Sequence, residues 1–379
     1  MRQPVKVLQI GMTNNIGGME TYLMAQYRKL DHTKIQYDFL NITGEYEIVF
    51  ADEIRKNGDH IFSVPSRHIS PFVHYISIFK LLYRKRRDYQ YIVLNTCSLF
   101  YVFPLFAAAI VGIPHRIIHS HNSGDEGKKT FFKSCIKAFN RFLLRYSATD
   151  YWACSQMAGK WMFGSKKFTI IHNAIDTKKF LYNPVIRQMI REDLNLKGKF
   201  VVGTVARFSP QKNHELLIDI FNEIVKREKN SILMLVGDAA GFDTRLQMIK
   251  NKVYLYHLED KVLFLGMRND TNKLYQAMDC HVLPSKFEGL CITALEVQAA
   301  GLPCICSCFF STETKITDQF YTLKLTDSPS VWAEFILNHR IKNRKNMLKE
   351  FVEAGYDIDA EISRISKIYM TDKKGELSS

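Results

Sequence analysis

Two glutamates in the second half of this 379-residue sequence have a spacing that could serve chemistry. Glu288 and Glu296 stand eight residues apart, beside the apolar stretch from Leu290 to Ala300. Eight residues are a little over two helical turns, so a helix from Glu288 to about Ala300 would carry both carboxylates on roughly one face. Helical glutamates are usually solvated, but these apolar surroundings make exposure less expected. Two carboxylates on that face could bind sugar hydroxyls.

Two cations mark a second candidate site. Arg207 and Lys212 lie in the loop 206–213, between an apolar strand pattern and a helical pattern. Two cations beside a helix N-terminus can neutralise a diphosphate. Cation pairs are often only solvated surface, but a position between a buried strand and a helix start favours a phosphate site.

A glycine pair marks a third loop. Gly17 and Gly18 stand between the first expected strand and the first expected helix. Glycines there let the backbone approach a ligand and expose helix N–H groups to an anion. The loop is neither a G-x-G-x-x-G fingerprint nor a P-loop, and a Gly-Gly pair alone is usually only a turn.

The eight cysteines give little support to a metal site. None forms a C-x-x-C pair, and Cys304, Cys306 and Cys308 alternate, so on a strand they would share one face. A zinc tetrahedron would need a fourth ligand and usually wider spacing. We interpret the cysteines as buried free thiols in a reducing cytoplasm and expect no metal.

The charge is uneven along the chain. The net charge is +14, and residues 1–180 hold 25 Lys and Arg against 13 Asp and Glu, a surplus of +12. A basic half favours an anionic partner, which could be nucleic acid, a membrane surface or a phosphorylated substrate, although a solvated surface also fits. No signal peptide is visible, and the longest apolar run, Leu99 to Ile113, reads as a buried helix. We expect a cytoplasmic protein.

Strand and helix patterns alternate along the whole chain. This predicts an α/β fold with two Rossmann-like, doubly wound domains, at residues 1–180 and 181–360, and a helix at about 360–370 that could pack back onto the first. Ligands bind at the carboxyl ends of such strands, and the cleft between two domains is the expected active site. Strands are expected at 5–10, 35–40, 61–64, 91–94, 116–119 and 151–154, and at 200–205, 231–236, 262–265, 279–283 and 303–306.

Together these loops resemble the family-4 glycosyltransferases of the two-domain GT-B fold, over nearly the whole chain. The resemblance rests on the Arg207 to Lys212 loop, the Glu288 and Glu296 pair followed by Ala299-Ala300-Gly301-Leu302-Pro303, the segment Asn173-Ala174-Ile175-Asp176, and Gly17-Gly18-Met19-Glu20. The stretches His119-Ser120-His121-Asn122 and Gln211-Lys212-Asn213-His214 are most similar to the bacterial exopolysaccharide and capsule branch. One departure is Cys291, where close relatives have proline; we expect it to alter packing or the donor pocket.

The resemblance implies retaining transfer from a nucleotide-diphosphate sugar without a metal or other cofactor. Arg207 and Lys212 would hold the diphosphate and stabilise its charge as the leaving group departs. Glu288 would bind hydroxyls of the donor sugar, and Glu296 the ribose hydroxyls. A UDP-sugar is the commoner donor in this branch, although GDP stays open.

Backbone groups would complete the donor site. The resemblance places the N–H groups of Gly289 and Leu290, at the helix start, against the phosphate. Gly17 and Gly18 would close over the same diphosphate from the other domain.

A histidine would line the cleft near the transferred sugar. The resemblance favours His121, with His119 as the alternative, because strand alternation lets only one of them face inward. The implied acceptor is lipid-linked or a glycan, in surface polysaccharide biosynthesis.

A peripheral location at the inner face of the plasma membrane would suit a lipid-linked acceptor. Six cations between Lys128 and Arg145 are threaded through the apolar residues from Phe131 to Leu143, and four more stand at 84–87. A basic amphipathic face can lie at an anionic membrane surface. Equally, those aromatic residues could form core.

Three alternatives stay open. A nucleotide-sugar 2-epimerase of GT-B architecture would use the same donor without an acceptor. A nucleic-acid-binding protein would use the basic half, although only charge supports it. A binding subunit that has lost catalysis is disfavoured by the intact set of Arg207, Lys212, Glu288 and Glu296.

Overall fold

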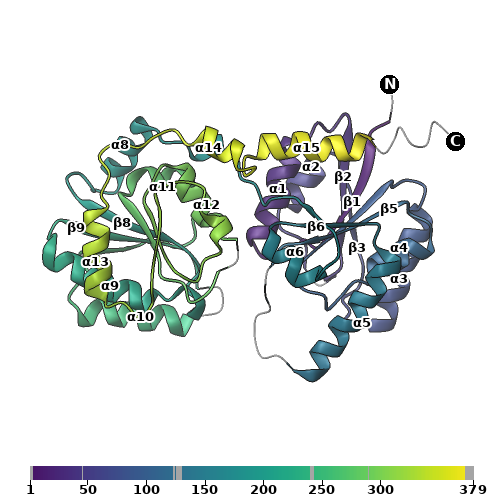
Figure 1. The fold of residues 1–379 in the computed structure, drawn as a ribbon, viewed down its shortest axis with the longest axis horizontal. Coiled ribbons are helices and arrows are strands. Elements are labelled where there is room, and N and C mark those ends of the chain that lie inside the picture. The colour runs from purple at the N-terminus through teal and green to yellow at the C-terminus, as the bar shows by residue number, and fades with distance from the viewer. Residues whose placement is uncertain are drawn as a thin grey trace. The chain divides into compact units, whose positions relative to one another are not determined.

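The computed structural model describes residues 3–371, except 45, 123, 125–129, 240–242 and 289. The chain divides into two compact units (Figure 1). The first holds the chain up to Ala174 and again from Ile358 on, and the second is the continuous segment Ile175–Asp357.

The first unit is built on a parallel sheet in the order β3-β2-β1-β4-β5-β6-β7, counted over the described residues. Its strands are runs of apolar residues because both faces of a parallel sheet are covered. They are β1 (Val5–Ile10), β2 (Ile35–Asn41), β3 (Ile61–Ser63), β4 (Tyr91–Thr96), β5 (His115–Ser120), β6 (Asp150–Ala153) and β7 (Thr169–Ile170).

Helices cover both faces of this sheet. One apolar cluster joins a face of the sheet to α1 (Gly18–Lys29), α2 (Ala51–Lys56) and α15 (Ile358–Thr371). A second cluster joins the opposite face to α3 (Pro71–Lys85), α4 (Phe103–Ile110), α5 (Phe131–Ser147) and α6 (Gln156–Phe163). The long apolar run therefore forms α4, and the last helix packs against α1 in this unit.

The second unit repeats the plan with a parallel sheet in the order β10-β9-β8-β11-β12-β13. The strands are β8 (Phe200–Val205), β9 (Ser231–Val236), β10 (Val262–Phe264), β11 (Cys280–Leu283), β12 (Cys304–Ser307) and β13 (Phe320–Leu323). One face is covered by α9 (His214–Arg227), α10 (Asp243–Leu255) and α13 (Pro329–Asn338). The other carries α7 (Thr177–Phe180), α8 (Pro184–Asp193), α11 (Thr271–Ala277), α12 (Ile292–Ala299) and α14 (Leu348–Glu353).

The structure corrects the prediction that all cysteines are buried. Cys304 and Cys306 on β12 are buried with their sulfur atoms 3.5 Å apart, but Cys308 lies beyond the strand and is exposed. Cys97 and Cys135 are also exposed. Over the part of the chain that the structure describes, no helix is long and apolar enough to cross a bilayer.

Candidate functional site

The predicted cation loop and the first glutamate follow neighbouring strands. In the second sheet, β8 lies between β9 and β11, so the chain order reverses there and the loops after β8 and β11 meet. Two hydrogen bonds join these loops: the Lys286 N–H donates to the Gln211 carbonyl at 2.8 Å, and Gln211 Nε2 donates to the Phe287 carbonyl at 2.9 Å. The fold therefore holds Lys212 and Glu288 side by side.

Lys212 and Glu288 form an ion pair. The Lys212 ammonium donates to Glu288 Oε1 at 2.5 Å, and the two side chains are only 15% and 8% exposed. Burial opposes the charge on Lys212, but its negative surroundings outweigh burial and raise its pKa. Because burial holds the pKa of Cys291 at about 12, that thiol is neutral at pH 7, and the Glu288 carboxylate supplies the negative charge.

Arg207 has no counterion among the residues that the structure describes. Its side chain is exposed and makes no hydrogen bond or ion pair with the described residues. It is nevertheless close enough to lower the pKa of Lys212 by charge repulsion. The loop thus presents one paired and one unpaired cation, which together carry more positive charge than Glu288 neutralises.

Glu288 does not lie on the helix, which corrects the sequence-based prediction. The helix α12 begins at Ile292, with Cys291 as its extended N-cap. The Glu288 N–H donates to the Phe309 carbonyl at 3.1 Å, which joins this segment to the loop after β12. Leu290 likewise precedes the helix rather than starting it, and Gly289 lies outside the described residues.

Glu296 sits on α12 with a partner that the sequence did not reveal. Its Oε2 accepts a hydrogen bond of 2.8 Å from the hydroxyl of Tyr275 on α11, and Tyr275 is fully buried. Burial raises the pKa of Glu296 to about 7, against the opposing effects of this hydrogen bond and of Lys179. Glu288 and Glu296 therefore differ in surroundings: the first is paired with a cation and the second with a phenol.

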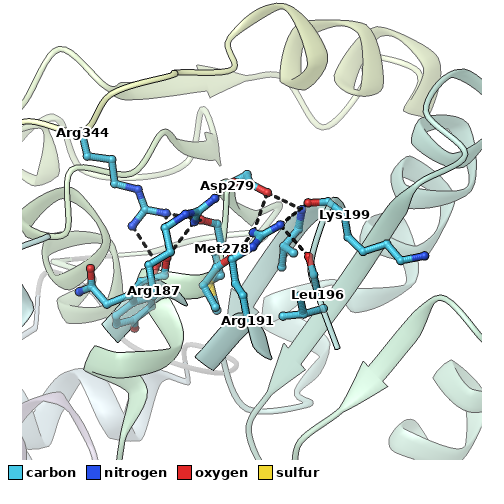
Figure 2. A network of polar contacts seen from close by, with 11 residues as sticks. Arg187, Arg191, Leu196, Lys199, Met278, Asp279 and Arg344 are labelled. Atoms are coloured by element: carbon cyan, nitrogen blue, oxygen red, sulfur yellow. Dashed lines mark hydrogen bonds and ion pairs between the residues drawn. The ribbon is translucent and has the colours of Figure 1, made fainter. Parts of the chain in front are cut away.

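Three arginines fix the end of α11 (Figure 2). Arg187, Arg191 and Arg344 donate to the carbonyl groups of residues 275–278, including 2.7 Å from Arg191 and 3.0 Å from Arg344. Asp279 pairs with Arg187 at 2.5 Å and with Arg191 at 3.3 Å. The last carbonyls of a helix lack intrahelical partners, so the guanidinium groups complete the end of this short helix.

Two neutral histidines adjoin the cation loop: His214 begins α9 directly after the loop, and His281 lies on the neighbouring strand β11. Burial, followed by the charge of Lys212, lowers the pKa of both His214 and His281 to about 3. The ring of His214 stacks on Phe208, and neither of its nitrogens has a hydrogen-bond partner among the described residues. His281 Nε2 accepts from the Val205 N–H at 2.9 Å.

The corresponding reversal point of the first unit lies between β1 and β4. A side chain at Gly11 would meet the Asn95 carbonyl at 2.2 Å, so glycine is needed where the two strand ends approach. Asn95 Nδ2 donates to Gln9 Oε1 at 2.9 Å and to the Ile10 carbonyl at 3.1 Å. Because a carbonyl can only accept, these bonds fix which way the Asn95 amide points.

The fixed Asn95 amide orients His121. Asn95 Oδ1 lies 3.0 Å from His121 Nε2, so this nitrogen carries the hydrogen. Burial lowers the pKa of His121 to about 4, which leaves Nδ1 unprotonated at neutral pH, 2.9 Å from Asn173 Oδ1. Because an unprotonated ring nitrogen and a carbonyl oxygen both accept, we assign the Asn173 amide the opposite orientation, with its Nδ2 donating to His121 Nδ1. His121 is partly exposed, whereas His119 is buried and contacts the Ile171 carbonyl at 3.2 Å.

A carboxylate lies against the glycine loop of the first unit. A Cβ atom at Gly17 would come within 2.8 Å of Glu20 Oε2, and Glu20 Oε1 accepts from the Thr13 hydroxyl at 2.9 Å. A larger residue at position 17 would therefore displace the end of the buried Glu20 side chain. The role of Gly17 and Gly18 toward a diphosphate stays a prediction.

The described parts of the chain contain no group of three or more His, Cys, Asp or Glu side chains that could hold a metal ion.

Known proteins match this architecture. Residues 186–353 match the family model described as "Glycosyl transferases group 1". The chain is 29% identical to the glycosyltransferase EpsF of Bacillus subtilis (strain 168), over 96% of each chain. It is 25% identical to the UDP-Gal:alpha-D-GlcNAc-diphosphoundecaprenol alpha-1,3-galactosyltransferase of Escherichia coli, over 97% of each. The protein is a glycosyltransferase.

The fold of this glycosyltransferase is also known. The crystal structure of Anabaena Alr3699/HepE in complex with UDP superposes with a TM-score of 0.71 at 18% identity, covering 99% of this chain and 100% of that chain. The predicted GT-B fold is confirmed. The epimerase and nucleic-acid-binding alternatives are not favoured.

Proposed function

We propose that this glycosyltransferase belongs to family 4 and retains anomeric configuration. It would move a sugar from a nucleotide-diphosphate sugar, with UDP as the nucleotide, to a lipid-linked or glycan acceptor in surface polysaccharide biosynthesis. The observation that carries the donor site is the buried Lys212–Glu288 ion pair beside the unpaired Arg207. Support for the substrates comes from the Escherichia coli relative, whose name specifies UDP-Gal and a diphosphoundecaprenol acceptor, and from the UDP bound in Anabaena HepE.

The cation pair suits a departing diphosphate. Negative charge grows on the diphosphate as the bond to the sugar breaks, so fixed cations stabilise the transition state more than the ground state. Arg207 can bind a phosphate without first breaking an ion pair to a described residue. Lys212 must first break its ion pair with Glu288 before it binds the phosphate. That exchange would release the Glu288 carboxylate to the sugar hydroxyls. Glu296 would take the ribose hydroxyls, and His121 would face the sugar as a neutral ring.

A panel of nucleotide sugars tests the donor. Slow hydrolysis without acceptor should single out one UDP-sugar, and transfer to a polyprenyl-diphosphate-linked sugar should give a product whose anomeric configuration, read by NMR, matches the donor. Inversion would contradict the retaining assignment.

We also propose that turnover needs no metal, because two side-chain cations stand where a divalent ion would act. Activity should persist in excess chelator. Loss of activity on chelation, with recovery on adding magnesium or manganese, would contradict this.

Peripheral membrane binding is supported by the outer face of α5. Five aromatic side chains of this helix are between 50% and 86% exposed: Phe131, Phe132, Phe139, Phe142 and Tyr146. Their spacing gathers them within one stripe of the helix, away from buried Asn140 and Leu144. They are therefore not core.

Charge identifies what could cover this stripe. Lys133, Lys137, Arg141 and Arg145 stand at every fourth position, so they line one flank of the stripe, and α5 contains no acidic residue. Lys137 lies over the rings of Phe100 and Trp161, and Arg141 donates to the carbonyls of Trp161 and Met162, while Lys133 and Arg145 are exposed. Lys128 and Lys129, which the sequence added to this set, lie outside the described residues. Aromatic rings beside cations match an anionic lipid surface, where each cation contributes on the order of 1 kcal/mol.

Vesicle flotation tests this part of the proposal. At low salt the protein should float with phosphatidylglycerol vesicles and not with phosphatidylcholine vesicles. The variant Phe139→Ser with Phe142→Ser should lose most of this binding, while Phe287→Ser, at an exposed phenylalanine of the second unit, should not. Absence of binding to anionic vesicles would contradict the membrane location.

A further inference from the structure

Tyr275 has no role in the motifs, yet it is joined to the site by a buried hydrogen bond. Its ring is fully buried between the rings of Phe180 and His281, with centroids 6.1 and 6.0 Å away. Its hydroxyl donates to Glu296 Oε2 at 2.8 Å. A phenol that is fully buried has little freedom, so it fixes one carboxylate oxygen of Glu296, while the other oxygen makes no hydrogen bond with the described residues.

The backbone beneath Tyr275 is held as firmly as its ring. Arg344 donates to the Tyr275 carbonyl at 3.0 Å, and Arg187 and Arg191 bind the following carbonyls (Figure 2). Arg344 is half-buried and carries its charge against these carbonyls and against the ring of Tyr182, 4.9 Å away. The arginine cluster thus secures the helix end that presents Tyr275 to Glu296.

We propose that Tyr275 is a positioning residue for nucleotide binding, which orients Glu296 toward the ribose hydroxyls. This inference rests on the proposed role of Glu296 in nucleotide binding. A cis-diol needs a carboxylate whose open lone pairs lie at fixed positions, and a carboxylate free to rotate would lose part of this geometry. Tyr275 acts through Glu296 and does not itself touch the ribose.

The ionisation of Glu296 gives this role a second signature. The groups that face it are Tyr275 from α11, Lys179 from α7 and, around the Tyr275 hydroxyl, the thiols of Cys291 and Cys304. Burial raises the pKa of Glu296 to about 7, and the phenol and Lys179 both act to lower it. An ionised carboxylate accepts two hydroxyl hydrogen bonds, so nucleotide affinity should fall as the pH drops below about 7. Removal of the phenol should move that fall to higher pH.

Calorimetry with UDP and 2′-deoxy-UDP tests the proposal on the full-length protein. Tyr275→Phe should weaken UDP binding by about tenfold, which is about 1.4 kcal/mol, because Glu296 is no longer held in one orientation. The binding of 2′-deoxy-UDP should weaken much less, so the preference for the 2′-hydroxyl shrinks. The midpoint of the pH dependence should shift upward. The matched control is Tyr256→Phe, which removes a different phenol, one that donates to Asp219 at 2.7 Å. This control should change neither the preference for the 2′-hydroxyl nor the midpoint of the pH dependence.

A double mutant separates positioning from a loss of folding. In the Glu296→Gln background, Tyr275→Phe should change neither the preference for UDP over 2′-deoxy-UDP nor the pH dependence of UDP affinity, because the carboxylate through which Tyr275 acts is already gone. An unchanged preference and unchanged midpoint in Tyr275→Phe would overturn the inference while UDP still binds. If the wild-type protein bound no UDP at any pH, the proposed function would fail instead.

Discussion

The two strand-order reversal points of this glycosyltransferase have similar topology and opposite chemistry. In the second unit, the site is charged: Lys212 is paired with Glu288, and Arg207 has no counterion among the described residues. In the first unit, the polar centre around His121 is neutral, and its partners are the amides of Asn95 and Asn173. The charged site suits a ligand whose charge changes during reaction, whereas the amide site holds one ring in one orientation.

The largest effect should come from removing the paired cation. Lys212→Ala should lower kcat and nucleotide affinity together, with a loss of transition-state stabilisation of roughly 2–4 kcal/mol, because an electrostatic donor to the departing diphosphate is gone. Steady-state kinetics with the preferred donor measure this. Lys286→Ala, at an exposed lysine of the adjoining loop, is the control and should be close to wild type. Equal losses of kcat and nucleotide affinity in both variants would show that overall surface charge, and not the Lys212 site, determines activity.

Introducing a charge beside His121 in the first unit should destabilise the protein. Asn95→Asp keeps the size of the side chain but replaces the donor that faces the Ile10 carbonyl by an acceptor. An unpaired buried carbonyl and an unsolvated carboxylate should lower the free energy of unfolding by about 2–3 kcal/mol. Chemical denaturation followed by circular dichroism tests this. A variant as stable as wild type would show that the Asn95 amide is not held as described.

The stability of the protein should change in opposite directions when the ring nitrogens of His121 and of His214 are removed. His121→Phe leaves the amides of Asn95 and Asn173 without partners and should destabilise the fold by about 1–2 kcal/mol. His214→Leu removes two nitrogens that have no partner in the described structure, and should be neutral or stabilising by up to about 1 kcal/mol. Thermal unfolding of the two variants compares them directly, and the same sign in both would remove the contrast between the two sites.

Features that depend on a short stretch of sequence could be predicted from the sequence alone. Apolar runs bounded by polar turns placed β8 and β9 at their observed residues. Arg207 and Lys212 were recognisable because charge beside a strand end is unusual. Glu288 was misplaced because a spacing of eight fits a helix equally well, and only the extended backbone at Cys291 shows that the helix starts after Glu288.

Hydrogen-bond partners that other helices and strands supply to the site residues were harder to predict from the sequence. Tyr275 reaches Glu296 from a helix 21 positions earlier, and no motif includes it. Asn95 offered one signal, an amide near the carboxyl end of a buried strand beside the central strand. Such contacts depend on how helices and strands pack, so a single sequence does not reveal them.

The exchange of Lys212 between Glu288 and a diphosphate is the central claim, and UDP calorimetry on Glu288→Gln tests it most directly. Without the carboxylate, Lys212 no longer has to leave an ion pair, so UDP should bind on the order of fivefold more tightly while sugar transfer falls. Glu296→Gln should instead weaken UDP binding, although it removes the same charge eight residues away. UDP affinity that is unchanged or weaker in Glu288→Gln would contradict the account.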